Sequence, residues 1–95
     1  MNHSETYQKI KQYFTDKPVK KVLVFGSVSR NDDDKHSDID LIILPSHPLG
    51  LIVLGKYVAE LEELIHRKVD LATENSITPD FLKQIQNDLQ LIYAA

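Results

Sequence analysis

Three aspartates stand inside otherwise apolar segments of this 95-residue chain. Asp38 and Asp40 are two positions apart, so their side chains point to the same face if the segment is a β-strand. Asp70 is flanked by Val69 and Leu71, which again places a carboxylate in an apolar run. Carboxylates in such positions repel one another and lose hydration, so a cation should compensate them. The pattern therefore predicts a cation-binding site.

The chemistry of these side chains indicates which cation. Oxygen-only ligands with open positions suit Mg²⁺ or Mn²⁺, which keep bound waters and bind substrate phosphates. A site with two such ions would activate an attacking oxygen and stabilise a leaving oxygen during an in-line phosphoryl displacement. We therefore expect Asp38, Asp40 and Asp70 to act together in phosphoryl chemistry.

A short turn, Gly26-Ser27, offers the features that bind a triphosphate. Glycine allows the backbone to approach phosphates closely, and Ser27 adds a hydroxyl at the start of a helical turn, which it could cap. Arg30 follows one turn later and could hold a phosphate through two parallel hydrogen bonds. We interpret Gly26, Ser27 and Arg30 as candidate nucleotide-binding residues.

Helix and strand patterns alternate along the chain. Apolar spacing predicts a first helix along Tyr7, Ile10 and Phe14 that ends at residues 16–18, a second over residues 51–65 and a third that starts at Pro79. Strands are predicted over residues 22–25, 38–44 and 68–73, with a short final strand over 89–93. Ser4 is the expected cap of the first helix. The expected apolar faces of the second and third helices are Leu51, Leu54, Val58, Leu61 and Ile65, and Phe81, Leu82 and Ile85. Glu60, Glu62 and Glu63 are expected on the solvent side.

The connections between strands predict how the aspartates meet. The short link from the first to the second strand favours antiparallel pairing, and the helix before the third strand favours a right-handed parallel crossover. The end of the first strand and the starts of the next two then share one edge. We expect a single α/β (α+β) domain, residues 1–95, with a small mixed sheet flanked by helices and with Gly26, Ser27, Asp38, Asp40 and Asp70 at that edge.

These motifs together resemble the minimal nucleotidyltransferase (MNT) family of the polymerase-β-like superfamily. The family pattern is G-S-x-x-R, a short loop, S-D-x-D-L, a helix and a third Asp in a V-D-L strand, and this chain reads Gly26-Ser27-Val28-Ser29-Arg30, Ser37-Asp38-Ile39-Asp40-Leu41 and Val69-Asp70-Leu71. The resemblance covers nearly the whole chain. It implies the nucleotidyltransferase fold.

The resemblance also implies roles for the motif residues. Asp38 and Asp40 would coordinate the metals, most simply two Mg²⁺ ions. Asp70 would be the third carboxylate and the base for the attacking hydroxyl. Gly26 and Ser27 would contact the β- and γ-phosphates of ATP, while the role of Arg30 is less settled.

Proteins of this kind are typically encoded beside a HEPN-domain ribonuclease toxin. The resemblance therefore implies an antitoxin that transfers AMP from ATP to a tyrosine hydroxyl of that toxin and forms an oligomeric complex with it. Two alternatives stay open: an antitoxin that neutralises by binding alone, and a nucleotidyltransferase that acts on a small molecule or RNA.

Two departures from the family pattern affect the same loop. Many members read G-S-x-A-R-G, whereas this chain has Ser29 and Asn31, and three further aspartates, Asp32 to Asp34, follow. We expect those three to form a solvated loop. Neither departure touches the metal ligands, so the expected activity is retained, although loop dynamics and docking of the acceptor could differ.

Composition excludes several other classes of protein. Eleven Lys and Arg against fourteen Asp and Glu give a net charge of −3, which argues against a general nucleic-acid-binding surface. The absence of cysteine excludes disulfides and thiolate metal sites. No apolar run is long enough for a membrane span and no export signal is evident, so we expect a cytoplasmic protein.

Overall fold

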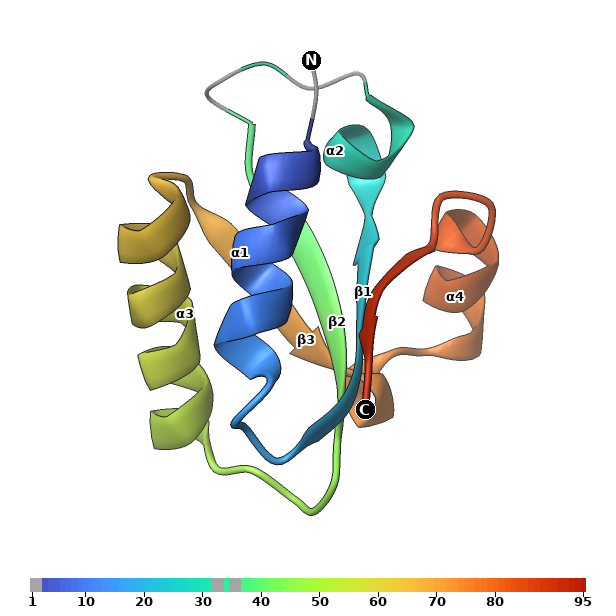
Figure 1. Cartoon of the computed structure of the whole chain (residues 1–95). Helices are drawn as coiled ribbons and strands as arrows, with labels where there is room; N and C mark the ends of the chain where they lie inside the picture. The colour runs from blue at the N-terminus through green and yellow to red at the C-terminus, as the bar shows by residue number, and fades with distance from the viewer. Residues whose placement is uncertain (1–2, 32–33, 35–36) are drawn as a thin grey trace.

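The computed structural model describes residues 3–31, 34 and 37–95, and its centre is a four-stranded sheet flanked by helices (Figure 1). The elements in chain order are α1 (Ser4–Phe14), β1 (Val19–Phe25), α2 (Gly26–Arg30), β2 (Ile39–Pro45), α3 (Leu51–Ile65), β3 (Val69–Thr73), the 3₁₀ turn η1 (Glu74–Ser76), α4 (Pro79–Ile85) and β4 (Gln90–Ala94). This order confirms the predicted fold class. The predicted solvated loop lies outside the described residues at Asp32 and Asp33, whereas Asp34 is described and exposed.

The sheet has the predicted mixed topology. Its strand order is β3-β2-β1-β4, with β1 antiparallel to β2 and β4, and β2 parallel to β3. Phe25, at the end of β1, lies opposite Asp40, and Asp40 lies beside Asp70 across the parallel pair. The end of one strand and the starts of two others therefore meet at one edge.

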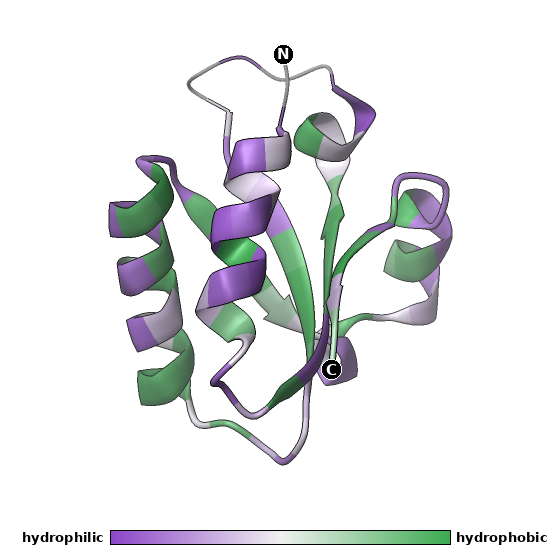
Figure 2. Cartoon of the chain, in the orientation of Figure 1, coloured by the Kyte–Doolittle hydropathy of each residue, from purple (hydrophilic) through white to green (hydrophobic). Residues whose placement is uncertain are grey.

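Helices α1 and α3 cover one face of the sheet and form the core with it (Figure 1). Alternate strand residues point into this layer because successive side chains of a strand face opposite sides. The fully buried large side chains are Ile10, Phe14, Val22, Val24, Val28, Ile39, Leu41, Ile43 and Leu61. Figure 2 shows the same division, with apolar strands and polar outward stripes on α1.

The opposite face of the sheet is covered more thinly, by η1 and α4. Thr78 caps α4 as predicted, since its hydroxyl oxygen accepts a hydrogen bond from the N–H of Phe81 at 3.1 Å. Of the predicted apolar face, Ile85 is buried, while Phe81 and Leu82 stay 36% and 44% exposed. A hollow of about 270 Å³ lies between α4 and the sheet and is lined by Leu23, Ile42, Leu44, Glu74, Ile77, Leu82 and Leu89.

Several predicted boundaries need correction. β1 starts at Val19, three residues earlier than predicted, and pairs there with Pro45, one residue beyond the predicted end of the second strand. Proline is tolerated because it is the last residue of β2 and donates no ladder hydrogen bond. The other strands differ from prediction by one residue at one or both ends.

Both predicted serine caps are wrong. Ser4 lies inside α1 and Ser27 inside α2, and the cap positions fall on His3 and Phe25, whose side chains make no capping hydrogen bond. A capping serine would directly precede the first helical residue, but here the helices already include the serines. The glycine before Ser27 already adopts the helical hydrogen-bonding pattern.

The predicted face of α3 is right except at its start. Leu61 is fully buried and Leu54, Val58 and Ile65 pack against the core, but Leu51 is 87% exposed. Tyr57, which the prediction omitted, is buried and replaces it. Within the described residues, no helix is long and apolar enough to span a membrane.

Glutamates of α3 are also less purely solvent-facing than predicted. Glu60 accepts a hydrogen bond from the hydroxyl of Tyr13 at 2.6 Å, which links α1 to α3. Burial, reinforced by this glutamate, raises the pKa of the Tyr13 hydroxyl. Glu62 accepts the N–H of Val69 at 2.8 Å and so anchors the start of β3. Glu60 and Glu63 are exposed as predicted, whereas Glu62 is half-buried.

Candidate active site

Gly26 joins β1 to α2 in a left-handed conformation, with φ of 78°, that side chains rarely adopt. A Cβ atom at this position would collide with the carboxylate of Asp40. Two separate demands, the backbone angle and the space, therefore select glycine here. The result is a close approach of the backbone at the start of α2 to the Asp40 carboxylate, whereas the approach to phosphates stays a prediction.

Asp40 is the partly buried member of the aspartate group. Burial raises the pKa of its carboxyl, the charges of Asp70 and Asp38 raise it further, and the charge of Arg30 opposes them. Asp70, Asp38 and Arg30 are thus each close enough to Asp40 to act on its carboxyl electrostatically. The register of the strands places Asp70 directly beside Asp40.

The starts of β2 and β3 fix two of the aspartates. Asp40 and Asp70 are direct neighbours across the parallel strands. The N–H of Ile39 donates to the carbonyl of Lys68 at 2.9 Å, which aligns the two strand starts. Ile39 is buried on the helical side while Asp70 is exposed, so the carboxylates lie on the face opposite α1 and α3.

Asp38 precedes β2 and is exposed. Arg67 fixes the backbone that precedes Asp38. Its Nε donates to the carbonyl of Ser37 at 3.0 Å, and its Nη2 donates to the carbonyl of Asp34 at 2.6 Å. Sequence reasoning missed Arg67, because nothing in a residue thirty positions away signals a contact with two backbone carbonyls. It is a structural support of the site.

The aspartates fit a divalent metal by their chemistry. Among the residues that the structure describes, no three His, Asp or Glu side chains form a ready metal cage. Mg²⁺ usually takes only one or two protein carboxylates and completes its shell with water and substrate phosphates, so an enclosed cage is not required. Burial raises the pKa of the Asp40 carboxyl most, and the charges of Asp70 and Asp38 add to it; a bound cation would offset both effects.

Arg30 forms an ion pair instead of standing alone at the site. Its Nη1 lies 2.7 Å from Oδ2 of Asp88, in the turn between α4 and β4. Ser29 donates its hydroxyl to the carbonyl of the same Asp88. Sequence reasoning missed Asp88, because it lies almost sixty positions from α2 in a polar turn. The serine that departs from the family pattern therefore makes a specific contact.

The second departure, Asn31, also has a structural reason. It ends α2 in the left-handed conformation, with φ of 62°, and its N–H donates to the carbonyl of Val28 at 3.1 Å. Glycine is the usual residue there, and asparagine is the side chain that tolerates the conformation best. The substitution thus keeps the shape of the turn.

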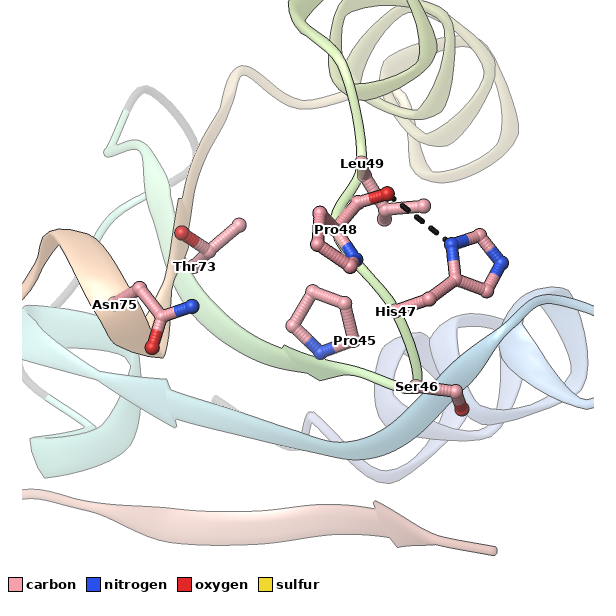
Figure 3. Close-up of a pocket in the computed structure, with 7 residues that line it drawn as sticks. All are labelled: Pro45, Ser46, His47, Pro48, Leu49, Thr73 and Asn75. Atoms are coloured by element: carbon pink, nitrogen blue, oxygen red, sulfur yellow. Dashed lines mark hydrogen bonds between the residues drawn. The ribbon is translucent and has the colours of Figure 1, made fainter.

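A pocket among the described residues lies away from the aspartates. It measures about 300 Å³ and is lined by Pro45, Ser46, His47, Pro48, Leu49, Thr73 and Asn75 (Figure 3). These residues are at the ends of β2 and β3, whereas the aspartates are at their starts. None of the predicted site residues lines it. The chemistry therefore points to the open edge and not to this pocket.

Comparison with known proteins agrees with this assignment. Residues 8–95 match the family described as "Polymerase beta, Nucleotidyltransferase". Two relatives from Methanocaldococcus jannaschii are each named as a candidate protein adenylyltransferase. One is 42% identical over 75% of this chain and 74% of its own length. The other is 35% identical over 93% of this chain and 95% of its own.

Solved structures share the fold. A toxin–antitoxin structure with AMP-PNP matches with a TM-score of 0.82 at 22% identity, over 94% of this chain and 73% of that chain. A tri-AMPylated HEPN toxin of Shewanella oneidensis in complex with an MNT antitoxin matches with a TM-score of 0.78 at 20% identity, over 99% and 74%. At such identities the likeness concerns the fold.

Proposed function

The chain belongs to the polymerase-β-like nucleotidyltransferase family, and we propose that it transfers AMP from ATP to a tyrosine hydroxyl of a HEPN-domain toxin and so acts as an antitoxin. The observation that carries the proposal is the placement of Asp40 beside Asp70 across the parallel strands and against the Gly26 turn. Relatives named for protein adenylylation, and neighbours described as toxin–antitoxin complexes, favour this acceptor.

Asp38 and Asp40 are the residues that would hold Mg²⁺, with two ions the simplest arrangement and Mn²⁺ a substitute. A bound metal would supply Lewis acidity to the α-phosphate and neutralise charge on the leaving pyrophosphate. Gly26 and Ser27 would orient the β- and γ-phosphates through the backbone at the start of α2. Arg30, whose side chain is about half exposed at 47%, can be approached by a phosphate.

Asp70 would act as the base. It is exposed, as a group must be to meet an acceptor carried by another protein, and it adjoins Asp40. The attacking hydroxyl oxygen forms a bond to the α-phosphorus, the bond to the bridging oxygen of the β-phosphate breaks, and the hydroxyl proton passes to Asp70. AMP remains on the acceptor and pyrophosphate leaves.

The acceptor is expected to bring its own surface. The pocket of about 300 Å³ lies at the opposite ends of the strands, and Asp38 and Asp70 are exposed. An open site suits a macromolecular acceptor better than a small molecule, which is usually surrounded on most sides. The net charge of −3 makes an RNA acceptor the less favoured macromolecule.

The test is the intact mass of a HEPN partner after incubation with this protein, ATP and Mg²⁺. We expect the partner to gain one or more AMP masses. The Asp38→Ala/Asp40→Ala variant should give no gain, and Glu63→Ala, which removes an exposed carboxylate of α3, should behave as the unaltered protein.

The other outcomes separate the alternatives. No gain of mass with a stable complex would replace transfer by an antitoxin that acts through binding alone. No gain and no complex would overturn the toxin as acceptor, and the same assay with small-molecule hydroxyls and RNA would then identify the acceptor class.

A further inference from the structure

Asp88 connects the turn between α4 and β4 to α2 through an ion pair and a hydrogen bond. Its carboxylate pairs with Arg30 at 2.7 Å, and its carbonyl accepts the hydroxyl of Ser29. Its own N–H donates to the carbonyl of Ile85 at 2.8 Å, which fixes the turn that follows α4. Both the main chain and the side chain of one residue are therefore engaged with a helix almost sixty residues away.

Stability alone is a weak reason for this arrangement. The Arg30 side chain is 47% exposed, and an ion pair with that exposure contributes at most about 1 kcal/mol. The Asp88 side chain, in contrast, is only 19% exposed, so an anion has been brought in close beside a surface that is meant to receive phosphates. The charge of Asp88 alone would disfavour phosphate binding, so a second effect of Asp88 on the site is needed to explain its position.

We infer that Asp88 is a positioning residue, which holds the guanidinium of Arg30 in the orientation that receives the nucleotide phosphates. This inference rests on the proposed function, since it takes Arg30 as a phosphate contact. A guanidinium is a planar fork, and an ion pair along one of its edges fixes the plane of the whole group. The hydrogen bond from the Ser29 hydroxyl fixes the backbone of Asp88, and this in turn positions the carboxylate that pairs with Arg30.

Two physical effects of Asp88 predict opposite signs. If its charge simply repelled the nucleotide, removal of the charge would strengthen ATP binding. If Asp88 orders Arg30, removal of the charge takes away one restraint on the guanidinium, more of its order must be gained during binding, and ATP binding weakens. The direction of one measurement therefore separates positioning from simple electrostatics.

The experiment measures binding of ATP with Mg²⁺ to the full chain by calorimetry, for Asp88→Asn, Arg30→Gln and the double variant. We expect Asp88→Asn to weaken binding by about three- to tenfold, the scale of one charge-assisted hydrogen bond, although it removes a negative charge. In the Arg30→Gln background the same change should have no further effect, because Asp88 acts through Arg30.

Matched controls exclude a folding defect. Asp80→Asn removes an exposed carboxylate from the first turn of α4, far from the Arg30 contact in sequence, and should leave ATP binding unchanged. Ser29→Ala, which removes the hydroxyl bond to the Asp88 carbonyl, should weaken binding less than Asp88→Asn. In turnover, Asp88→Asn should raise KM for ATP more than it lowers kcat, a division that general destabilisation would not produce.

Three results would overturn the inference. Equal or tighter ATP binding by Asp88→Asn excludes positioning, and an equal loss in the Arg30→Gln background shows that Asp88 does not act through Arg30. Failure of the unaltered protein to bind ATP with Mg²⁺ at all would remove the proposed function itself, and this inference with it.

Discussion

Gly26 is the residue on which the geometry of the site depends most directly. Gly26→Ala would put a Cβ atom against the Asp40 carboxylate at a φ of 78°. We expect at least a 100-fold loss of AMP transfer, because shifts of about 1 Å in a reacting site have effects of that size. Intact-mass and ATP-binding assays measure the loss.

Gly55 provides the matched control for that prediction. It lies inside α3, where an added Cβ meets nothing within 4 Å. Gly55→Ala should stabilise the protein by about 0.5–1 kcal/mol through helix propensity and leave activity unchanged. If Gly26→Ala transferred AMP at the unaltered rate, the close approach of Gly26 to Asp40 would have no catalytic meaning.

Asp40 should carry a cost in stability that is visible as a pH dependence. Its pKa in the folded protein is raised above the ordinary value of 3.8, first by burial and then by Asp70 and Asp38. The folded state therefore binds the Asp40 proton more tightly than the unfolded chain does. The free energy of unfolding consequently falls as pH rises from below 3.8 through the raised pKa.

Asp40→Asn should remove this part of the pH dependence. At pH 7 and with a metal chelator present, we expect the free energy of unfolding of the variant to exceed that of the unaltered protein by a few tenths to about 1 kcal/mol. The gain is modest because solvent screens a partly exposed carboxyl. Urea unfolding at pH 4 and pH 7 measures the difference. Lower stability of Asp40→Asn than of the unaltered protein at pH 7 would contradict repulsion among the aspartates.

At the scale of single elements, the ends of the helices were harder to predict than their faces. Thr78 was found because a capping residue followed by proline is a local signal. Ser4 and Ser27 are also common capping residues, but they are not caps here. The helices begin at Ser4 and Gly26, so both serines lie inside them. Leu51 fitted the apolar spacing of α3 yet is exposed, so spacing alone did not show which turns of the helix meet the core.

The site was predictable where it depended on strands. The apolar pattern placed Asp40 at the start of a strand, although Asp38, predicted in the same strand, directly precedes β2. Short and long connections gave antiparallel and parallel pairing, which brought Asp70 beside Asp40. Contacts by Arg67 and Asp88 could not be predicted, because they join backbone carbonyls or polar turns across the fold and follow no period.

His66 tests the left-handed helix end of α3. Its φ is 56°, in a region where a side chain is strained and glycine is not. His66→Gly should therefore stabilise the protein by about 0.5–1 kcal/mol despite the greater freedom of glycine in the unfolded chain. Thermal unfolding measures the change.

Asn31→Gly is the comparison for His66→Gly. Asn31 has the same conformation at the end of α2, but asparagine tolerates it better, so the gain should be smaller. A larger gain at Asn31 than at His66 would mean that local side-chain contacts, and not backbone strain, decide the stability of these ends.

For the whole molecule, the sheet divides the chain into a well-packed layer and a thin one. The layer with α1 and α3 holds nearly all the fully buried side chains, whereas α4 buries only Ile85 of its own residues. The aspartates lie on the thin side. Binding of a nucleotide and of an acceptor thus occurs where the protein has the least packing to lose, as expected for segments that open at low free energy.

This division predicts how hydrogen exchange is distributed over the chain. Amide hydrogens of α4 should exchange much faster than those of β1 and β2 around Val24 and Leu41, since α4 can open without disturbing the main core. Phe81 meets Phe25 edge to face at 5.7 Å, so Phe81→Ala should speed exchange in α4 and leave the sheet centre unchanged. Equal protection of α4 and the sheet centre would show that the two layers unfold as one unit. The contacts of Asp88 with α2 would then be only some of many that hold α4 in place.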